Sequence, residues 1–159
     1  MDETAKTVAE SRVTLGLMMG PEHANALGNV HGGVIMKFVD EAGALAAMRH
    51  ARCPVVTVAI DSMTFLEPIF VGHLVWFNAE LTYAGRTSME SRVEVIAEDP
   101  LTGATTHTNL AFLVYVAIDE NRRPTPVPRL IAETEEEKQR MALAQKRQEM
   151  RKQRQQNEQ

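Results

Sequence analysis

Four stretches of the chain after residue 54 are predicted to be β-strands. Polar and apolar side chains alternate along residues 73–83 and 87–98, residues 55–65 are rich in β-branched side chains, and residues 104–118 are apolar from Leu110 onward. Alternation with a period of two is typical of a β-strand with one buried face. Because short, turn-rich segments link these stretches, we expect an antiparallel meander. A further strand is predicted at residues 11–19. The four stretches cover residues 55–65, 73–83, 87–98 and 104–118.

Residues 33–50 instead repeat their apolar side chains at the spacing of an α-helix. These side chains cover so broad a side that we expect the helix to be buried. A helix that follows the first strand and is covered by an antiparallel sheet defines the α+β class. The apolar side chains are Val34, Ile35, Phe38, Val39, Ala42, Leu45 and Ala46.

Two carboxylates, Asp40 and Glu41, lie in the middle of this apolar helix. Glu41 has Lys37 four residues before it, a spacing at which the two can pair. Asp40 has only Lys37, three residues before it, as a nearby cation, and its helical neighbours are mostly small. A carboxylate in an apolar slot is costly unless it has a partner or a chemical role. Asp40 is therefore a candidate catalytic residue, with an ion pair to Lys37 as the structural alternative.

The turn before the helix carries a second candidate feature. Gly32 and Gly33 have no side chains, so a ligand can approach the backbone closely. The first N–H groups of a helix lack internal partners and lie at the positive end of its dipole, where they can polarise a carbonyl oxygen. Asn29 adds a side-chain donor and acceptor. The alternative is a flexible turn before a buried helix.

Composition narrows the class of protein. The 159 residues suit one domain, and a net charge of −4 argues against nucleic-acid binding. No stretch approaches the roughly 18 uncharged apolar residues that a membrane span needs. The single cysteine, Cys53, fits a reducing compartment, and the first ten residues lack the apolar run of a secretory signal. We therefore expect a cytoplasmic protein.

The two ends of the chain differ from its middle. The polar residues 1–10 predict a flexible N-terminus, followed by a folded domain over residues 11–131. Thr134 and Glu137 form a capping-box pattern that starts a helix in the charged C-terminal segment, residues 132–159. Because this helix has almost no apolar stripe, we favour a solvated tail over a partner-binding helix.

Four motifs, in order, resemble those of the cytosolic acyl-CoA hydrolases of the hotdog superfamily. The resemblance runs from about residue 13 to the final helix. It implies a single hotdog fold, in which an antiparallel sheet wraps around one long helix and two such units pair. A homodimer is therefore expected, and assembly into a hexamer, as a trimer of dimers, stays open. The motifs are GNVHGG (28–33) followed by DEAG (40–43), VTVAID (56–61), GRTSM (85–89), and PTPVP (124–128) followed by ETEEEK (133–138).

The resemblance also implies an activity, the hydrolysis of acyl-CoA thioesters to free fatty acid and coenzyme A. It makes Asp40 the general base or nucleophile, and Asn29 a residue that orients water or substrate. The N–H of Gly33 is the implied donor to the thioester oxygen. The resemblance places Asn29 and Asp40 of one site on different subunits. His31 and Gly32 are implied neighbours of the thioester, although packing at the turn is the simpler role for His31.

A second turn is a candidate for binding the coenzyme. Gly85, Arg86, Thr87 and Ser88 combine exposed N–H groups, two hydroxyls and a cation, which suits a phosphate or the pantetheine arm. On these residues alone, a solvated turn is the alternative.

Other chemistries lack their motifs. The chain has no Gly-x-Ser-x-Gly nucleophile motif and no His-Glu-x-x-His zinc motif, so we expect no metal and no cofactor beyond the coenzyme A of the substrate. The alternative function is a non-catalytic acyl-CoA or acyl-carrier binding module. Asp40 distinguishes the hydrolase from the binding module, because a protein that only binds acyl-CoA gains nothing from a carboxylate in that slot. A hotdog dehydratase is disfavoured by the order of the residues.

Overall fold

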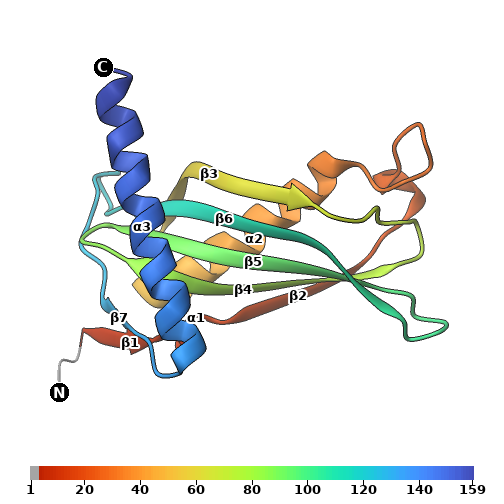
Figure 1. Cartoon of the computed structure of the whole chain (residues 1–159), viewed down its shortest axis with the longest axis horizontal. Coiled ribbons are helices and arrows are strands. Elements are labelled where there is room, and N and C mark those ends of the chain that lie inside the picture. Colours follow the sequence, from red (N-terminus) through yellow and green to blue (C-terminus); the bar gives the residue numbers. More distant parts are fainter. Residues whose placement is uncertain (1–3) are drawn as a thin grey trace.

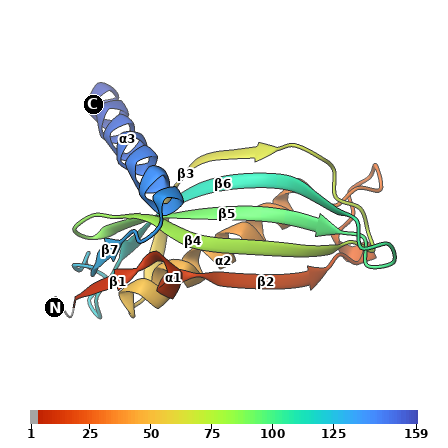
Figure 2. The same cartoon turned by 60° about the horizontal axis from the view of Figure 1, so that its bottom comes forward.

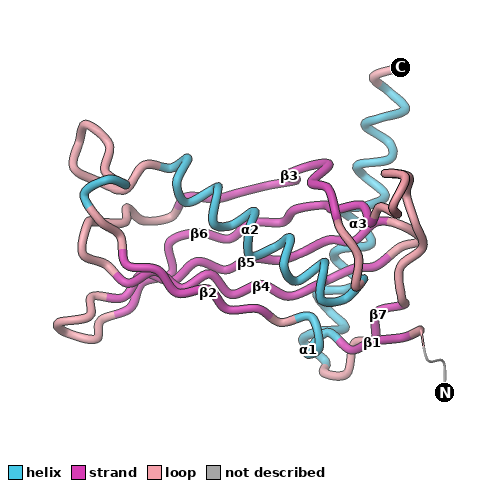
Figure 3. The backbone as a smooth tube through the Cα atoms, turned by 180° about the vertical axis from the view of Figure 1, so that it is seen from behind, coloured by secondary structure: helices cyan, strands magenta, loops and turns pink. Residues whose placement is uncertain are grey.

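The computed structural model describes residues 4–159 as a five-stranded sheet with a long helix on each face (Figure 1). Helix α2, Gly32–Ala51, lies against one face of the sheet, and helix α3, Glu135–Asn157, crosses the other (Figures 1 and 3). A short 3-10 helix, Pro21–His23, precedes α2. The predicted α+β hotdog architecture is confirmed. The strands of the sheet are β2 (Val13–Met18), β3 (Val55–Phe65), β4 (Leu74–Ala84), β5 (Ser88–Glu98) and β6 (Thr105–Ala117).

The order of the strands, β2-β4-β5-β6-β3, corrects one part of the predicted topology. The meander is present in β4, β5 and β6, and all pairings in this sheet are antiparallel. Strand β3 does not pair with β4, however, but lies at the far edge beside β6 (Figure 2). Alternation identifies a strand but not its neighbour, so the sequence pattern contains no signal for this crossing.

The core lies between the sheet and one side of α2. Val39, Ala42 and Ala46 of the helix are buried in the same apolar cluster as Phe77 and Leu113 of the sheet. The rest of the helix surface is only partly covered, and Met36 and Leu45, on opposite flanks of the helix, keep 39% and 37% of their surface exposed. The predicted burial of the helix therefore holds for one side only. No helix in the described residues is long and apolar enough to cross a membrane.

The N-terminal residues are ordered differently from the prediction. Residues 1–3 lie outside the described residues, but β1, Ala5–Thr7, pairs in parallel with β7, Arg129–Ile131. Helix α1, Val8–Ser11, follows, with a capping box between Thr7 and Glu10. Val8 is buried. The expectation of an irregular, flexible segment is wrong for residues 5–10, because a capped turn and one buried side chain anchor them.

Helix α3 begins where its capping box predicts, with Thr134 accepting from the N–H of Glu137.

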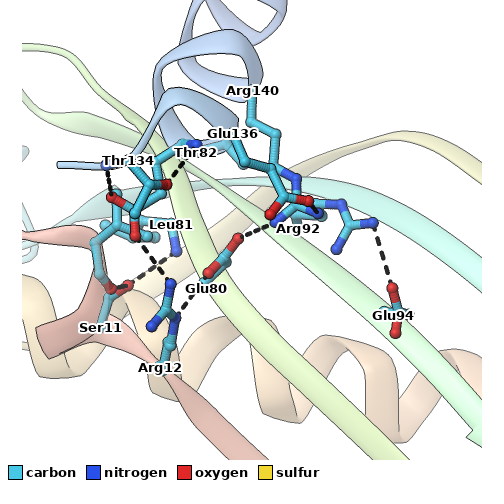
Figure 4. Close-up of polar contacts among 12 residues, drawn as sticks. Ser11, Arg12, Glu80, Leu81, Thr82, Arg92, Glu94, Thr134, Glu136 and Arg140 are labelled. Carbon is cyan, nitrogen blue, oxygen red and sulfur yellow. Dashed lines mark hydrogen bonds and ion pairs between the residues drawn. The ribbon is translucent and has the colours of Figure 1, made fainter. Parts of the chain in front are cut away.

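The helix is not a solvated tail, because a stripe of arginines faces buried carboxylates on the sheet. Arg12 and Arg140 converge on Glu80 (Figure 4). Arg12 Nε lies 3.0 Å from Glu80 Oε2, and a terminal guanidinium nitrogen of Arg140 lies 2.7 Å from Glu80 Oε1. Further along, Arg147 and Arg151 both pair with Glu90, whose side chain is fully buried. Charge, rather than apolar area, attaches this helix.

Candidate active site

The carboxylate of Asp40 is held by two hydroxyl groups from the sheet. Its Oδ1 accepts a hydrogen bond from Thr57 Oγ1 on β3, at 2.8 Å, and from the Tyr115 hydroxyl on β6, at 3.0 Å. Its Oδ2 accepts no hydrogen bond from any residue between 4 and 159. Lys37 makes no ion pair with Asp40 among these residues, and its Nζ lies 5.4 Å from the ring centre of Phe38. One carboxylate oxygen is therefore fixed and the other is available.

The slot that small neighbours were expected to leave beside Asp40 is filled by Tyr115. The Tyr115 hydroxyl also lies 3.0 Å from the main-chain oxygen of Asp40. A Cβ added at Gly43 would approach that hydroxyl to 2.5 Å, so only glycine fits there. Burial, and then the Asp40 carboxylate, raise the pKa of Tyr115 above its ordinary value. The phenol therefore stays protonated and donates to Asp40.

The turn before α2 places His31 where the substrate was expected. His31 is the N-cap of α2, and its Nδ1 accepts from the N–H of Gly33 at 3.0 Å. The N–H that was predicted to polarise a thioester is thus already bonded in this structure. Asn25 is oriented by the same turn, because its Oδ1 accepts from the N–H groups of Leu27 and Asn29 at 2.9 and 3.2 Å. With its oxygen held in this way, Asn25 presents its amide NH₂ group as a donor.

These turn residues line an open pocket of about 290 Å³ at the N-terminal end of α2. Asn25 and Asn29 form one wall with Gly32, and Phe65 from the end of β3 forms another. Phe65 is 54% exposed, so its ring borders solvent. The predicted residues Asn29 and Gly32 are therefore brought together, and Asn25 joins them.

Asp40 does not belong to this pocket within one chain. It lies seven residues after Gly33 in α2, which places it about 10 Å further along the helix axis. Reacting atoms must approach to about 3–3.5 Å. A single thioester group therefore cannot contact both the N-terminus of α2 and Asp40 of the same chain.

The turn at residues 85–88 lies at the Asp40 end of the sheet. It closes with a hydrogen bond from the N–H of Gly85 to the carbonyl of Ser88, and Arg86 is exposed. The register places Met89 of β5 opposite Tyr115, which in turn lies opposite Thr57. The side chain of Ser88 lines a cavity under α3, on the face of the sheet away from Asp40.

Three polar residues of this region were missed in the sequence. Thr57 and Tyr115 are single polar positions within apolar strand patterns, and their partner on α2 is distant in the chain. Asn25 was available as a signal, since it precedes Asn29 in the same glycine-containing turn. No group of three or more potential metal ligands occurs among residues 4–159.

An antiparallel sheet curled around one long helix, with a carboxylate held by hydroxyls at the middle of that helix, defines a hotdog protein with a polar site beside its central helix. The chain matches the Thioesterase superfamily over residues 27–104. It is 38% identical to a Bacillus subtilis protein named uncharacterized acyl-CoA thioester hydrolase YkhA, covering 80% of this chain and 74% of that protein. It is also 38% identical to the mouse cytosolic acyl coenzyme A thioester hydrolase, over 84% of this chain and 38% of that protein. The chain belongs to the Thioesterase superfamily and, within it, to the acyl-CoA thioester hydrolases.

Solved structures agree over nearly the whole chain. The acyl-CoA hydrolase of Staphylococcus aureus, in complex with butyryl coenzyme A and coenzyme A, superimposes with a TM-score of 0.90 at 33% identity, covering 97% of this chain and 94% of that chain. An apo-hexameric acyl-CoA thioesterase superimposes with a TM-score of 0.92 at 40% identity, covering 95% and 97%. The protein is thus a thioester hydrolase with the fold of these enzymes throughout.

Three variants of the Staphylococcus aureus enzyme give a residue spacing that can be compared with the spacing in this chain. Three of its structures carry alanine in place of an asparagine at position 28, an aspartate at position 43 and a threonine at position 60. The aspartate therefore follows the asparagine by 15 positions and precedes the threonine by 17. In this chain, Asn25, Asp40 and Thr57 have the same two spacings, whereas Asn29 does not.

Proposed function

We propose that two copies of this chain hydrolyse acyl-CoA thioesters to a free acid and coenzyme A, with Asp40 of one copy acting at the α2 N-terminus of the other. The supporting observation is the Asp40 carboxylate, with Oδ1 fixed by Thr57 and Tyr115 and Oδ2 available to act. The separation between Asp40 and Gly33 along α2 is the reason for placing the site between copies.

In this site, Asp40 is the general base or nucleophile for the thioester carbon. The amide of Asn25 orients the attacking water or the substrate, a role for which it is better suited than Asn29 because two N–H groups fix its oxygen. The N–H groups of Gly32 and Gly33 polarise the carbonyl oxygen. For Gly33 to do so, the exposed His31 side chain must turn away from its N–H.

The coenzyme binds, in this proposal, across the turn at residues 85–88. This turn lies at the Asp40 end of the sheet, and the exposed guanidinium of Arg86 suits a phosphate. Gly85 and Thr87 contribute backbone close to the substrate. Ser88 is the weakest of the four candidates, because it lines the cavity under α3.

Two surfaces support pairing of the copies. Strand β3 is an edge strand, and Val56, Val58 and Ile60 along it are 42–53% exposed. Helix α2 also exposes Met36 and Leu45, one on each flank. A self-complementary contact would cover both. We propose a homodimer that assembles further into a hexamer, as an acyl-CoA thioesterase of the same fold does.

We also propose a cytoplasmic location, which the single cysteine and the mammalian relatives named as cytosolic support. The reaction requires no metal in this proposal, since carboxylate, amide and N–H groups supply each function. Hydrolysis that survives extensive treatment with a chelator is the expected result.

The experiment that tests the proposed function compares the native chain with Asp40→Asn. Free thiol release is measured across acyl-CoA chain lengths. We expect turnover to fall by about 100-fold or more, with the fold intact by circular dichroism, because the amide keeps the shape but cannot act as base or nucleophile. A native chain that binds acyl-CoA without releasing thiol would favour the binding module. Full turnover by Asp40→Asn would reject the assigned carboxylate.

A further inference from the structure

The Tyr115 hydroxyl is the only phenol that reaches Asp40 among residues 4–159, and it contacts Asp40 twice. Its oxygen lies 3.0 Å from Oδ1 and 3.0 Å from the main-chain oxygen of the same residue. The ring is fully buried on β6, so it cannot rotate away. A rigid group from the sheet thus spans the backbone and the side chain of one helical residue.

We propose that Tyr115 is a positioning residue for hydrolysis, which holds the Asp40 carboxylate in the one orientation that presents Oδ2 to the thioester. This inference rests on the proposed function of the site. Thr57 donates to the same Oδ1, so two hydroxyls on different strands fix one oxygen and leave the other free. With two anchors, the carboxylate cannot rotate about its Cβ–Cγ bond without losing both hydrogen bonds.

Gly43 belongs to the same arrangement. Glycine in the interior of a helix costs about 1 kcal/mol relative to alanine, so its presence in α2 needs a reason. The reason is space, because a Cβ at this position would lie 2.5 Å from the Tyr115 hydroxyl and 3.3 Å from two ring atoms. The Gly43 carbonyl also accepts from Ser91 Oγ at 2.8 Å, which seats this turn of the helix on β5. The helix thus accommodates the phenol at the turn that carries Asp40.

The test is Tyr115→Phe, which removes one oxygen and keeps the buried ring. We expect kcat to fall about tenfold with KM within about twofold of the native value, because one hydrogen bond to a charged group is lost away from the coenzyme. The melting temperature should fall by no more than about 4 °C, since no cavity forms and the lost hydrogen bond is worth about 1 kcal/mol. The matched control is Tyr83→Phe, at the only other tyrosine, which should keep native kcat.

A second variant, on α2, perturbs the same contact between Tyr115 and Asp40. Gly43→Ala should lower kcat by displacing the hydroxyl, and adding Tyr115→Phe should cause little further loss. Losses that multiply in the double variant would contradict the proposal, as would a native kcat in Tyr115→Phe. A rise in KM alone would also contradict it. A native chain that hydrolyses no acyl-CoA would reject the proposed function, and this proposal with it.

Discussion

Arg86 is an exposed cation at the tip of the β4–β5 hairpin, and in the proposed site it would contact the coenzyme rather than the reacting carbon. We expect Arg86→Ala to raise KM for acyl-CoA more than it lowers kcat, because a phosphate contact is equally strong in the ground and transition states. Steady-state kinetics with acyl-CoA and with a short pantetheine thioester provide the measurement.

The short thioester lacks the nucleotide, so its KM should not respond to Arg86→Ala. Arg154→Ala removes the same charge from the exposed end of α3 and is the matched control. Equal losses on both substrates, or equal effects of the two arginines, would contradict a role in coenzyme binding.

Residues that lie in one sequence motif were easier to predict than residues that meet across the fold. Asp40 is recognisable because a carboxylate interrupts an apolar helix. Thr57 and Tyr115 are not, because they reach Asp40 only once α2 has packed against two strands. The role of Asn29 stays a prediction, and the two hydrogen bonds that hold the Asn25 amide are visible only in the folded turn.

At the scale of elements, α3 is attached through the fully buried carboxylate of Glu90. Arg147 donates to both its oxygens, at 3.1 and 2.7 Å, and its guanidinium lies 3.8 Å from the ring centre of Phe112. We expect Arg147→Ala to destabilise the protein by about 3 kcal/mol, because it leaves a buried charge with one arginine fewer. Chemical denaturation measures this loss.

Lys146→Ala, which removes an exposed cation from the position just before Arg147, is the control and should change stability by less than about 0.5 kcal/mol. Replacing Glu90 and Arg147 together by leucine and methionine should recover much of the loss. Equal small effects of Arg147→Ala and Lys146→Ala would show that the buried pair does not hold α3.

His50, near the end of α2, makes stability depend on pH. Its Nε2 donates to the carbonyl of Pro128 at 2.7 Å, while its buried Nδ1 finds no acceptor or donor among residues 4–159. Burial lowers the pKa of His50 below its ordinary value, so the unfolded chain binds a proton more readily than the folded one. Stability is therefore complete above about pH 6.5 and declines as the pH falls below it.

Melting temperatures between pH 8 and pH 5 test this expectation. His50→Gln keeps a donor for Pro128 but cannot titrate, so its melting temperature should decline less steeply over the same interval. Parallel curves for the two proteins would show that other groups cause the decline.

Local signals predicted most elements but not how they pack. The capping box at Thr134 gave the start of α3, and the same pattern at Thr7 and Glu10 was present but overlooked. The arginines of α3 recur at helical spacing and therefore share one side of the helix. A search for apolar side chains at that spacing does not detect them. The carboxylates that bind them are on other strands, which no local pattern reveals.

For the whole molecule, the decisive feature is that Asp40 and the turn before α2 are separated within each chain. We expect Asn25→Ala and Asp40→Ala chains each to be nearly inactive, and activity to return when the two are unfolded, mixed and refolded together. With random pairing about half the dimers are mixed, and one of their two sites is intact, so about a quarter of all sites recover. Hydrolysis before and after mixing measures this.

Size-exclusion chromatography must show that the mixed sample is dimeric or larger. Refolding each variant alone is the control and should restore nothing. If confirmed mixed assemblies stay inactive, both residues serve a site within one chain, and the intersubunit site is rejected.

The surroundings of Asp40 depend on pairings between distant parts of the chain. Thr57 and Tyr115 are 58 residues apart, and the β1–β7 pair joins residues 124 positions apart. Such non-local contacts require long loops to close and therefore slow folding, whereas helices and hairpins form from neighbouring residues. A newly made chain can thus form α2 and the β4–β5 hairpin early, while the carboxylate acquires its two hydroxyl partners only once β3 has docked on β6.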